Sequence, residues 1–316
     1  MSIAVVRTST GWWVEDAAGR WHAIATRAAT TAELLADRTA VDAAARQAAA
    51  GLAGEEPAGD ELSSPVTTPC RVVAQMVNYR SHAVDSGFDP DTVPPAFFRK
   101  ASGSVSGPFD DVIRPAGVRF LDYEVELGLV IGAHLPIGTE VTEANLADYV
   151  HGLVVANDIS ARDLQLPKTQ FYESKSYPTF TPLGPRLVLT DAADLARFAE
   201  LRLTLQVNGV TRQDHGTTDM IVRPARALSL LARFQTLQPG DVLLTGTPGG
   251  TALKAPGRLA ATLGALLPPH KRWQVFFDRQ AKNPDYLQPG DVVTTRIATA
   301  DRAIDLGEQR TVVRAL

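Results

Sequence analysis

Cysteine is nearly missing from this chain, since Cys70 is the only one among 316 residues. A single thiol excludes an intramolecular disulfide framework and a cysteine-rich zinc site, and it is compatible with a reducing compartment. The chain also lacks a basic excess. Its 31 Lys and Arg residues stand against 35 Asp and Glu residues, which gives a formal net charge of −4. Proteins that bind nucleic acid are typically basic, so we expect no nucleic-acid partner.

Long apolar runs are absent as well. No stretch approaches the roughly 18 apolar residues of a membrane span. The first residues, MSIAVVRTSTGWW, show no basic region followed by an apolar one, so they do not resemble a signal peptide. We therefore expect a cytoplasmic protein with no membrane association.

The composition is otherwise that of a folded globular protein, with 45% hydrophobic and 21% charged residues. Its 24 glycines and 21 prolines favour many turns and short strands over long helices. The length fits one domain with a small attachment. Residues 51–66, GLAGEEPAGDELSSPV, are polar and acidic and are typical of a linker. We predict a small N-terminal domain at residues 1–65 that packs on a main domain at residues 66–316.

The apolar pattern predicts strands before and after this linker. Residues 1–26 are expected to form short strands, and residues 30–50 a helix capped by Thr30 or Thr31 with Glu33 in its first turn. Asn208-Gly209 is a hairpin turn signal. In the main domain we predict one helix at 225–234 and strands at 71–77, 120–131, 149–156, 185–190, 201–207 and 241–245.

The sequence DYEVE at residues 122–126 places acidic side chains inside an apolar strand. Alternation in a strand sends Glu124 and Glu126 to the same face, and Asp122 points the same way. Three carboxylates on one buried face would repel one another strongly. Two interpretations therefore stay open: the face is solvated, or a cation lies there.

A second acidic signal comes at the end of the next apolar strand, where Asn157-Asp158 precedes helix-compatible residues. Asp158 is well placed as a third oxygen ligand, and Arg162 and Gln165 follow on one side of a helical turn. A set of oxygen ligands favours Mg²⁺, Mn²⁺ or Ca²⁺ over zinc. The alternative is that Asp158 simply caps a helix.

Three further segments carry candidate residues. Lys175 lies in a Pro/Gly-containing loop, where it either holds an anion or is solvated. Thr247 lies in the sequence TGTPGG at 245–250, whose glycines allow the backbone to approach a ligand closely. His82 and Asp85 are spaced to pair on one helical turn, although such a pair is more often a surface contact. No Gly-x-Ser-x-Gly elbow and no Cys/His arrangement occurs, which argues against classical nucleophilic hydrolysis.

Together these segments resemble the fumarylacetoacetate hydrolase family, in its bacterial acylpyruvate hydrolase and diene-dioate isomerase branch. The resemblance covers about residues 70–250 and implies an α+β fold, a mixed and strongly bent β-roll with few helices, to which a small N-terminal α/β part is attached. The matching phrases are NYRSHA (78–83), LDYEVELGLVIG (121–132), NDISARDLQ (157–165), SKSYPTFTPLGP (174–185), GTTDMI (216–221) and PGDVLLTGTPGG (239–250).

The resemblance also implies roles for these residues. One Mg²⁺ or Mn²⁺ per chain would be bound by Glu124, Glu126 and Asp158. Lys175 would neutralise the developing enolate or a carboxylate, and His82 would deprotonate the attacking water. Asp85 stands where the family usually has a glutamate that holds this histidine. The residues implied to contact the substrate are Tyr79, Arg162, Gln165 and Thr247.

The implied activity is hydrolysis of a carbon–carbon bond in a ketonic, acylpyruvate-like 1,3-diketo acid through a metal-chelated enolate, as in aromatic catabolism. The same chemistry leaves open an isomerase of a 2-hydroxydiene-dioate or a decarboxylase of a β-keto acid such as oxaloacetate. A catalytically silent ligand-binding homologue is a further alternative. The family commonly forms homodimers, so a homodimer is expected. The chain departs from the family by an insertion at 254–287, which we expect to reshape substrate choice or an oligomer contact.

Overall fold

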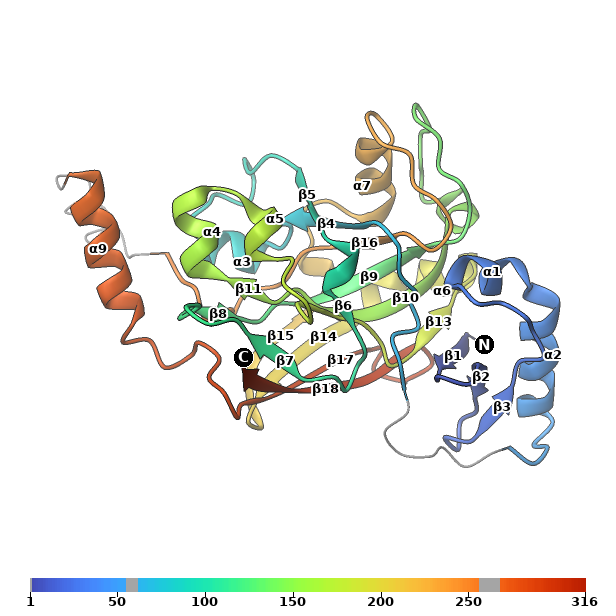
Figure 1. Ribbon diagram of the computed structural model, residues 1–316. Helices are drawn as coiled ribbons and strands as arrows, with labels where there is room; N and C mark the ends of the chain where they lie inside the picture. Colours follow the sequence, from blue (N-terminus) through green and yellow to red (C-terminus); the bar gives the residue numbers. More distant parts are fainter. Residues whose placement is uncertain (1, 55–61, 256–267) are drawn as a thin grey trace.

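Two main β-sheets with helices around them form the computed structural model, which describes residues 2–54, 62–255 and 268–316. One sheet has nine strands and the other has five (Figure 1). The sheets pack on each other through one apolar cluster, in which Leu129 and Leu153 of the larger sheet join Leu205 and Ile297 of the smaller. The predicted mixed α+β fold is therefore confirmed.

The nine-stranded sheet is antiparallel except between β16 and β4. Its interior strand β9 is buried at every position, so both of its faces are covered. In spatial order the strands are β3 (Trp21–Ala23), β2 (Trp12–Glu15), β1 (Ile3–Arg7), β13 (Leu187–Leu189), β10 (Val150–Asn157), β9 (Val125–Ile131), β16 (Val242–Leu244), β4 (Val72–Met76) and β5 (Ala96–Lys100).

The smaller sheet and two strand pairs complete the β-structure of the described residues. In the five-stranded sheet only β18 and β7 pair in parallel. Its order is β15 (Val210–Gly216), β14 (Arg202–Val207), β17 (Val292–Ala298), β18 (Asp305–Ala315) and β7 (Val112–Arg114). The separate pairs are β8 (Leu121–Asp122) with β11 (Ser160–Ala161), and β6 (Val105–Ser106) with β12 (Thr181–Pro182).

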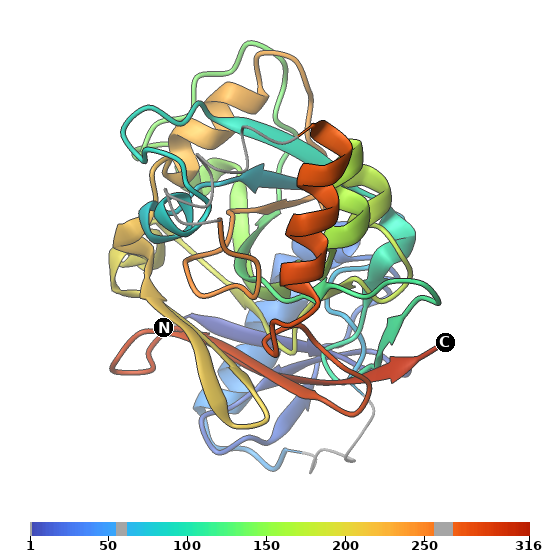
Figure 2. The ribbon, with the colours of Figure 1, turned by 90° about the vertical axis from the view of Figure 1, so that its left-hand side faces the viewer.

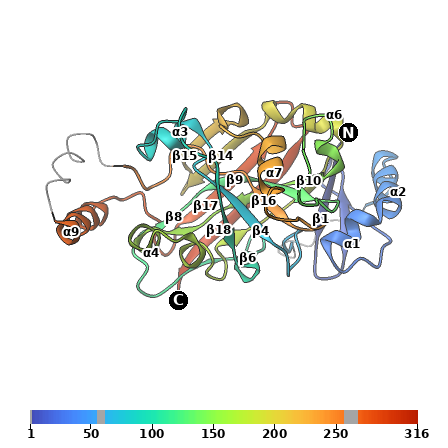
Figure 3. The ribbon, with the colours of Figure 1, turned by 90° about the horizontal axis from the view of Figure 1, so that it is seen from above.

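The helices surround the sheets (Figures 1 and 3). Helix α9 lies at one end of the molecule, and α1 and α2 lie at the other (Figure 3). Within the described part of the chain, no helix is long and apolar enough to cross a bilayer. The α-helices are α1 (Thr31–Ala36), α2 (Arg38–Ala49), α3 (Arg80–Asp85), α4 (Arg162–Lys168), α5 (Phe171–Ser174), α6 (Ala192–Ala196), α7 (Pro224–Leu231) and α9 (Pro269–Gln280). Short 3₁₀ turns occur at Ser102–Ser104, Leu146–Asp148, Phe198–Glu200 and Thr217–Asp219.

The N-terminal residues extend the main sheet. Strand β1 pairs with β13 in antiparallel register, and β2 and β3 follow outward. Side chains on both sides of the predicted boundary near residue 65, such as Leu34 and Val154, share one apolar cluster. The predicted linker contains residues 55–61, which lie outside the described residues, and Ser63 already pairs with Arg7. The described residues before residue 65 thus share a sheet and a core with the rest of the chain.

Two elements differ from the sequence prediction in instructive ways. The predicted helix at 30–50 is two helices, because Asp37 ends α1 and caps α2. Thr30 caps α1 as expected, in a capping box with Glu33. The predicted strand at 120–131 is interrupted at Tyr123 and Glu124, since β8 pairs with β11 whereas β9 pairs with β10. This interruption places Glu124 at a junction between two pairings.

Candidate active site

The pairing of β9 with β10 brings the acidic residues together. The register places Glu126 opposite Ala156 and Val125 opposite Asn157. Just beyond the paired residues, the Asp158 backbone N–H donates to the Glu124 carbonyl at 2.8 Å. The Glu124 backbone N–H in turn donates to the Asn157 side chain at 3.0 Å. Backbone hydrogen bonds therefore fix Asp158 beside Glu124.

Glu124, Glu126 and Asp158, the predicted metal ligands, form one buried cluster. Each offers a carboxylate oxygen, and these three oxygens lie within 4.8 Å of one another. All three side chains are almost completely shielded from solvent. The interpretation of this strand as a solvated acidic face is therefore wrong, and the alternative of Asp158 as a simple helix cap is also excluded because α4 begins only at Arg162.

Buried cations surround two of the three carboxylates. The Lys175 ammonium donates to Glu124 Oε2 at 2.7 Å and to Asp158 Oδ2 at 2.5 Å. The Arg162 guanidinium donates hydrogen bonds to Glu124 and to Asp122, and the distance to Asp122 Oδ2 is 2.8 Å. Burial alone would raise the pKa of Glu124, but Lys175 and Arg162 outweigh it and hold that pKa well below its usual range. Glu124 is therefore an anion that can bind a cation.

Lys100, at the end of β5, was not predicted from the sequence. Its ammonium bonds Asp158 and donates to the Phe180 carbonyl at 2.9 Å. Burial lowers the pKa of Lys100, and Asp158 opposes that shift. The only local signal is a lysine two residues after Phe98 in an apolar strand, which does not distinguish a buried lysine from an exposed one.

Glu126 has no cationic partner among the described residues. Its carboxylate accepts a hydrogen bond from the Gly246 backbone N–H at 2.8 Å. Burial raises the pKa of Glu126 well above its usual range, and the neighbouring Asp158 and Glu124 raise it further. This carboxylate therefore favours a bound proton, or a bound cation in its place.

The buried charges around the cluster leave one negative charge unmatched. Three cations, Lys100, Arg162 and Lys175, face four carboxylates. A divalent cation among the three clustered oxygens would satisfy Glu126 and leave one net positive charge for an anionic ligand. Carboxylate oxygens without nitrogen or sulfur donors suit Mg²⁺ or Mn²⁺, so the residues fit such an ion. The four carboxylates are Asp122, Glu124, Glu126 and Asp158.

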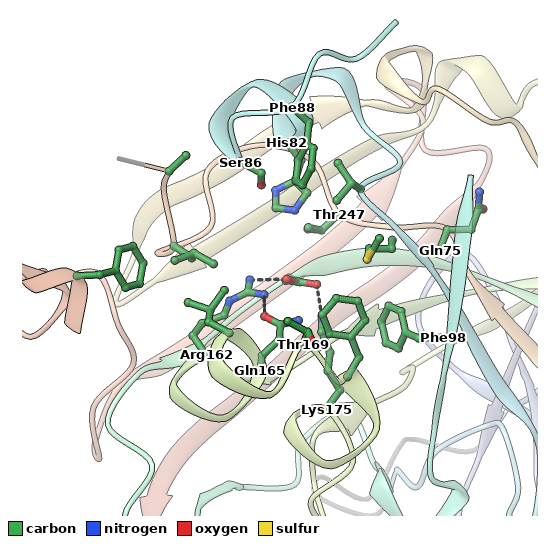
Figure 4. Close-up of a pocket in the computed structure, with 18 of the residues that line it drawn as sticks. Gln75, His82, Ser86, Phe88, Phe98, Arg162, Gln165, Thr169, Lys175 and Thr247 are labelled. Atoms are coloured by element: carbon green, nitrogen blue, oxygen red, sulfur yellow. Dashed lines mark hydrogen bonds and ion pairs between the residues drawn. The ribbon is translucent and has the colours of Figure 1, made fainter. Parts of the chain in front are cut away.

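A cavity of about 730 Å³ opens above Glu124 and Glu126. In Figure 4, His82 lies on one side, and Arg162, Gln165 and Lys175 lie on the opposite side. Gln165 accepts a hydrogen bond from Arg162 at 2.8 Å through its carbonyl oxygen, which leaves its amide N–H groups for a ligand. The structure thus brings most of the predicted site residues to one cavity.

His82, on α3, is nearly buried at the cavity wall. Its Nδ1 has no hydrogen-bond partner among the residues that the structure describes. Burial lowers the pKa of His82 below 6.5, although Glu124 partly opposes that shift. The imidazole is therefore neutral at pH 7, as a general base must be before it accepts a proton.

Asp85 does not hold His82, contrary to the expectation from the sequence. Its carboxylate accepts a hydrogen bond from the Gly250 backbone N–H at 3.0 Å. Ser81, also on α3, accepts from the Gly249 backbone N–H at 2.9 Å. These two side chains fix the loop that carries Thr247. The Asp85 carboxylate is therefore bound by the loop backbone and not by His82.

Two predicted substrate contacts also differ. Tyr79 is fully buried and does not line the cavity, so its expected contact with substrate is not supported. Thr247 does line the cavity, but its hydroxyl donates to the Val125 carbonyl at 3.0 Å and accepts from Gln213 at 2.8 Å. The Thr247 hydroxyl is therefore engaged within the protein, and the residue contributes to the shape of the cavity.

Gly246 links the loop to the carboxylate cluster, and its substitution gives a test of this packing. Its φ is +83°, and an added Cβ would lie 2.8 Å from the Asn78 Cβ. We expect Gly246→Ala to lower the free energy of unfolding by about 2–4 kcal/mol, since it combines backbone strain with a steric clash. Gly209→Ala is the matched control, because its φ is +78° and nothing lies within 4 Å. Equal losses of stability for the two variants in urea unfolding would contradict the close approach.

Comparison with known proteins places these observations in a family. A sequence model described as the fumarylacetoacetate (FAA) hydrolase C-terminal family matches residues 71–314. A mitochondrial oxaloacetate tautomerase of Rattus norvegicus is 37% identical over 193 residues, which cover 60% of this chain and 59% of the relative. The match thus spans about three fifths of the length of that curated relative.

Solved structures share the fold over the full chain. A probable 2-hydroxyhepta-2,4-diene-1,7-dioate isomerase from Mycobacterium abscessus has a TM-score of 0.74 and 29% identity, and the comparison covers 100% of this chain and 99% of that one. A maleylpyruvate hydrolase from Sphingobium sp. SYK-6, solved with manganese(II) and pyruvate, has a TM-score of 0.71 at 24% identity and the same coverage. The second likeness shows the fold alone.

Proposed function

The chain belongs to the fumarylacetoacetate hydrolase family of enzymes, and on that basis we propose that it is a divalent-metal-dependent hydrolase of acylpyruvates, which are 2,4-dioxo acids. One observation carries the proposal: the neutral His82 shares a cavity with a buried carboxylate cluster that has one unmatched negative charge. Such a site combines a base with a place for a cation. Hydrolysis of a bond between two carbonyl groups needs both.

The binding end of the cavity recognises the 2-oxo acid. Glu124, Glu126 and Asp158 would hold Mg²⁺ or Mn²⁺ as oxygen ligands, one ion per chain. The bound ion supplies Lewis-acid stabilisation of negative charge on the oxygens of the substrate. Arg162 and the free amide N–H groups of Gln165 donate hydrogen bonds to the substrate carboxylate, and Lys175 adds a positive charge beside the developing enolate.

The opposite wall of the cavity supplies the base. His82 accepts a proton from water as the water oxygen forms a bond to the C4 carbonyl carbon. The C3–C4 bond then breaks, and its electron pair passes into the pyruvate enolate. Protonation of that enolate at C3 completes the reaction, and the products are pyruvate and the carboxylic acid of the acyl group. One water is consumed and no redox cofactor takes part.

A second candidate is keto–enol tautomerisation of oxaloacetate, which the named activity of the Rattus norvegicus relative favours. This tautomerisation passes through the same kind of enolate as the hydrolysis. It needs a proton transfer but no addition of water. The isomerase named for the Mycobacterium abscessus structure uses the same kind of enolate. Decarboxylation of oxaloacetate would form the enolate by loss of CO₂.

Product analysis separates these reactions. Purified protein with Mg²⁺ or Mn²⁺ is incubated with acylpyruvates, oxaloacetate and a 2-hydroxydiene-dioate, and the products are identified by mass spectrometry. We expect a gain of one water and two acid products from the acylpyruvates. Loss of CO₂ would identify a decarboxylase, and a change in absorbance at constant mass would identify a tautomerase or isomerase.

The pH dependence tests His82 as the base. Because burial lowers the pKa of His82 below 6.5, its neutral form persists into mildly acidic solution. We expect the acid limb of the kcat/KM profile to have its midpoint below pH 6.5, because kcat/KM reports the free enzyme. A midpoint at pH 7 or above would show that another group is the base. Thermal unfolding across the same range shows whether the fold itself persists.

A further inference from the structure

The cavity has two chemically different parts. The charged and polar groups gather at the carboxylate cluster, whereas the remaining wall is mostly apolar. Phe98 marks the boundary between the two parts. Its ring lies 5.2 Å from the Lys175 ammonium and 5.2 Å from the Phe171 ring. An apolar surface therefore begins directly beside the groups that bind the 2-oxo acid.

Helix α9 provides a second apolar surface of the cavity, on the other side of Arg162 from Phe98 (Figure 4). Trp273 and Phe276 of α9 both line the cavity. The helix lies within the segment where this chain departs from the family pattern, and Figure 2 shows it in front of the rest of the chain when the molecule is viewed from that end. The side chains of this wall do not lie at the carboxylate cluster. The chemistry common to the family therefore does not explain why they are there.

Aromatic stacking attaches α9 to the main domain. Phe277 stacks on Phe120 at 5.7 Å between ring centroids, and Trp273 stacks on Phe277 at 5.6 Å. Beyond the helix, Tyr286 packs on Phe120 at 5.1 Å and donates to Gln280 at 2.8 Å. These contacts fix the base of α9, so its cavity-facing side chains have a defined position relative to the cluster.

The size of the cavity points to a large ligand. A volume of about 730 Å³ lies within the range of about 300–1,000 Å³ for pockets that enclose drug-sized molecules. A four-carbon acid such as oxaloacetate would fill only the charged part. It would leave Phe88, which is 51% exposed, and Trp273, which is 38% exposed, in contact with water. Burial of such surface against an apolar group is favourable.

Building on the function proposed above, we propose that the substrate is a 2,4-dioxo acid whose acyl substituent is large and apolar, such as an aroyl group. The dioxo acid end lies at the carboxylate cluster, and the acyl group extends from there toward α9, where Trp273 and Phe276 line the cavity. Arg279, also on the α9 wall, is the group that a terminal carboxylate would contact instead.

The test compares three substrates that share the dioxo acid end. They are acetylpyruvate, benzoylpyruvate and 2,4-dioxoheptanedioate, which carries a terminal carboxylate. We expect kcat/KM for benzoylpyruvate to exceed that for acetylpyruvate by about 10–100-fold, because the apolar pocket distinguishes substrates by buried area. A preference for the dicarboxylate over benzoylpyruvate, or equal values for acetylpyruvate and benzoylpyruvate, would overturn the proposal.

Variants locate the preference on the apolar wall. Trp273→Ala/Phe276→Ala should lower the ratio of kcat/KM for benzoylpyruvate to kcat/KM for acetylpyruvate at least tenfold. Phe88→Ala changes a different, half-exposed wall residue and should shift the preference in the same direction. Gln274→Ala, an exposed α9 residue outside the cavity lining, is the control and should behave like the parent. Equal losses for both substrates in the two wall variants would show that α9 does not select the acyl group.

Calorimetry separates this inference from the proposed function. The affinities for benzoylpyruvate and acetylpyruvate are measured in the presence of Mg²⁺, with product formation monitored in parallel. Tight binding of benzoylpyruvate that depends on Trp273 and Phe276 but gives no cleavage would refute the hydrolase and support the apolar acyl site. Cleavage of all three substrates at one rate, with equal affinities, would support the hydrolase and refute the acyl site.

Discussion

Replacement of Glu126 by glutamine should lower the affinity for Mg²⁺ or Mn²⁺ by about 10²–10⁴-fold. Removal of one partner from a buried charge site costs about 3–5 kcal/mol, which corresponds to that range. Glu126 is the ligand without a cationic partner among the described residues, so its charge is the one that the metal would neutralise. Glutamine keeps the shape and can still accept the hydrogen bond from Gly246.

In the absence of metal, the same Glu126→Gln substitution should stabilise the protein. Burial beside Asp158 and Glu124 raises the pKa of Glu126 and so costs stability at neutral pH, and a neutral glutamine avoids this cost. The variant should therefore raise the melting temperature of the metal-free protein while abolishing the rise produced by metal. Glu173→Gln is the matched control, since Glu173 is an exposed carboxylate that pairs with Lys168 near the site. Calorimetry that gives Glu126→Gln the parental metal affinity would contradict the assignment of the cluster.

His82→Ala should lower kcat by about 10²–10⁴-fold and leave metal affinity nearly intact, because a positioned base contributes that much to the rate. The imidazole lies on the cavity wall opposite Arg162 and Lys175 and holds no metal ligand in place (Figure 4). Rates with an acylpyruvate and metal titrations are measured on the same preparations. A variant that hydrolyses acylpyruvates at the parental rate would reject His82 as the base and leave the metal cluster unaffected.

Asp85 variants sharpen this result. Because Asp85 accepts a hydrogen bond from Gly250, we expect Asp85→Asn to retain near-parental activity through its remaining carbonyl oxygen. Asp85→Ala should lose more, since it releases the loop that carries Thr247. If Asp85 instead oriented and charged the His82 imidazole, both substitutions would lower kcat strongly.

Strand alternation was sufficient to predict part of the acidic cluster. It correctly placed Glu124 and Glu126 on one face, because neighbouring side chains in a strand point to opposite sides. The strand itself is interrupted at Tyr123, since β8 and β9 have different partners, and no local pattern shows where pairing changes. The end of the next apolar strand indicated Asp158 as a third ligand, with a helix cap as the alternative, and the resemblance favoured the ligand.

Long-range contacts explain what the sequence could not predict. Lys100 comes from β5 at the edge of the large sheet, and only the tertiary structure brings it to Asp158. The spacing of His82 and Asp85 correctly put both on α3, but it carried no information about the Gly250 backbone that takes the Asp85 carboxylate. Thr30, in contrast, caps α1 through a contact three residues away, which is why local reasoning succeeded there.

The insertion at 254–287 shows the same limit. Residues 256–267 lie outside the described residues, and α9 follows them. No helix was predicted there, and the sequence did not indicate that Trp273 and Phe276 would line the cavity, because that depends on the stacking of Phe277 on Phe120. The predicted effect of the insertion on substrate choice thus becomes a specific proposal about two side chains.

The most direct measurement is anomalous diffraction at the manganese edge from crystals grown with Mn²⁺ and oxalate, an unreactive mimic of the 2-oxo acid. We predict one strong anomalous peak per chain, about 2.1–2.3 Å from oxygens of Glu124, Glu126 and Asp158, with oxalate completing the coordination on the side that faces His82. A peak elsewhere, or Lys100 and Lys175 still paired with these carboxylates and no peak between them at saturating Mn²⁺, would contradict a metal-dependent enolate mechanism.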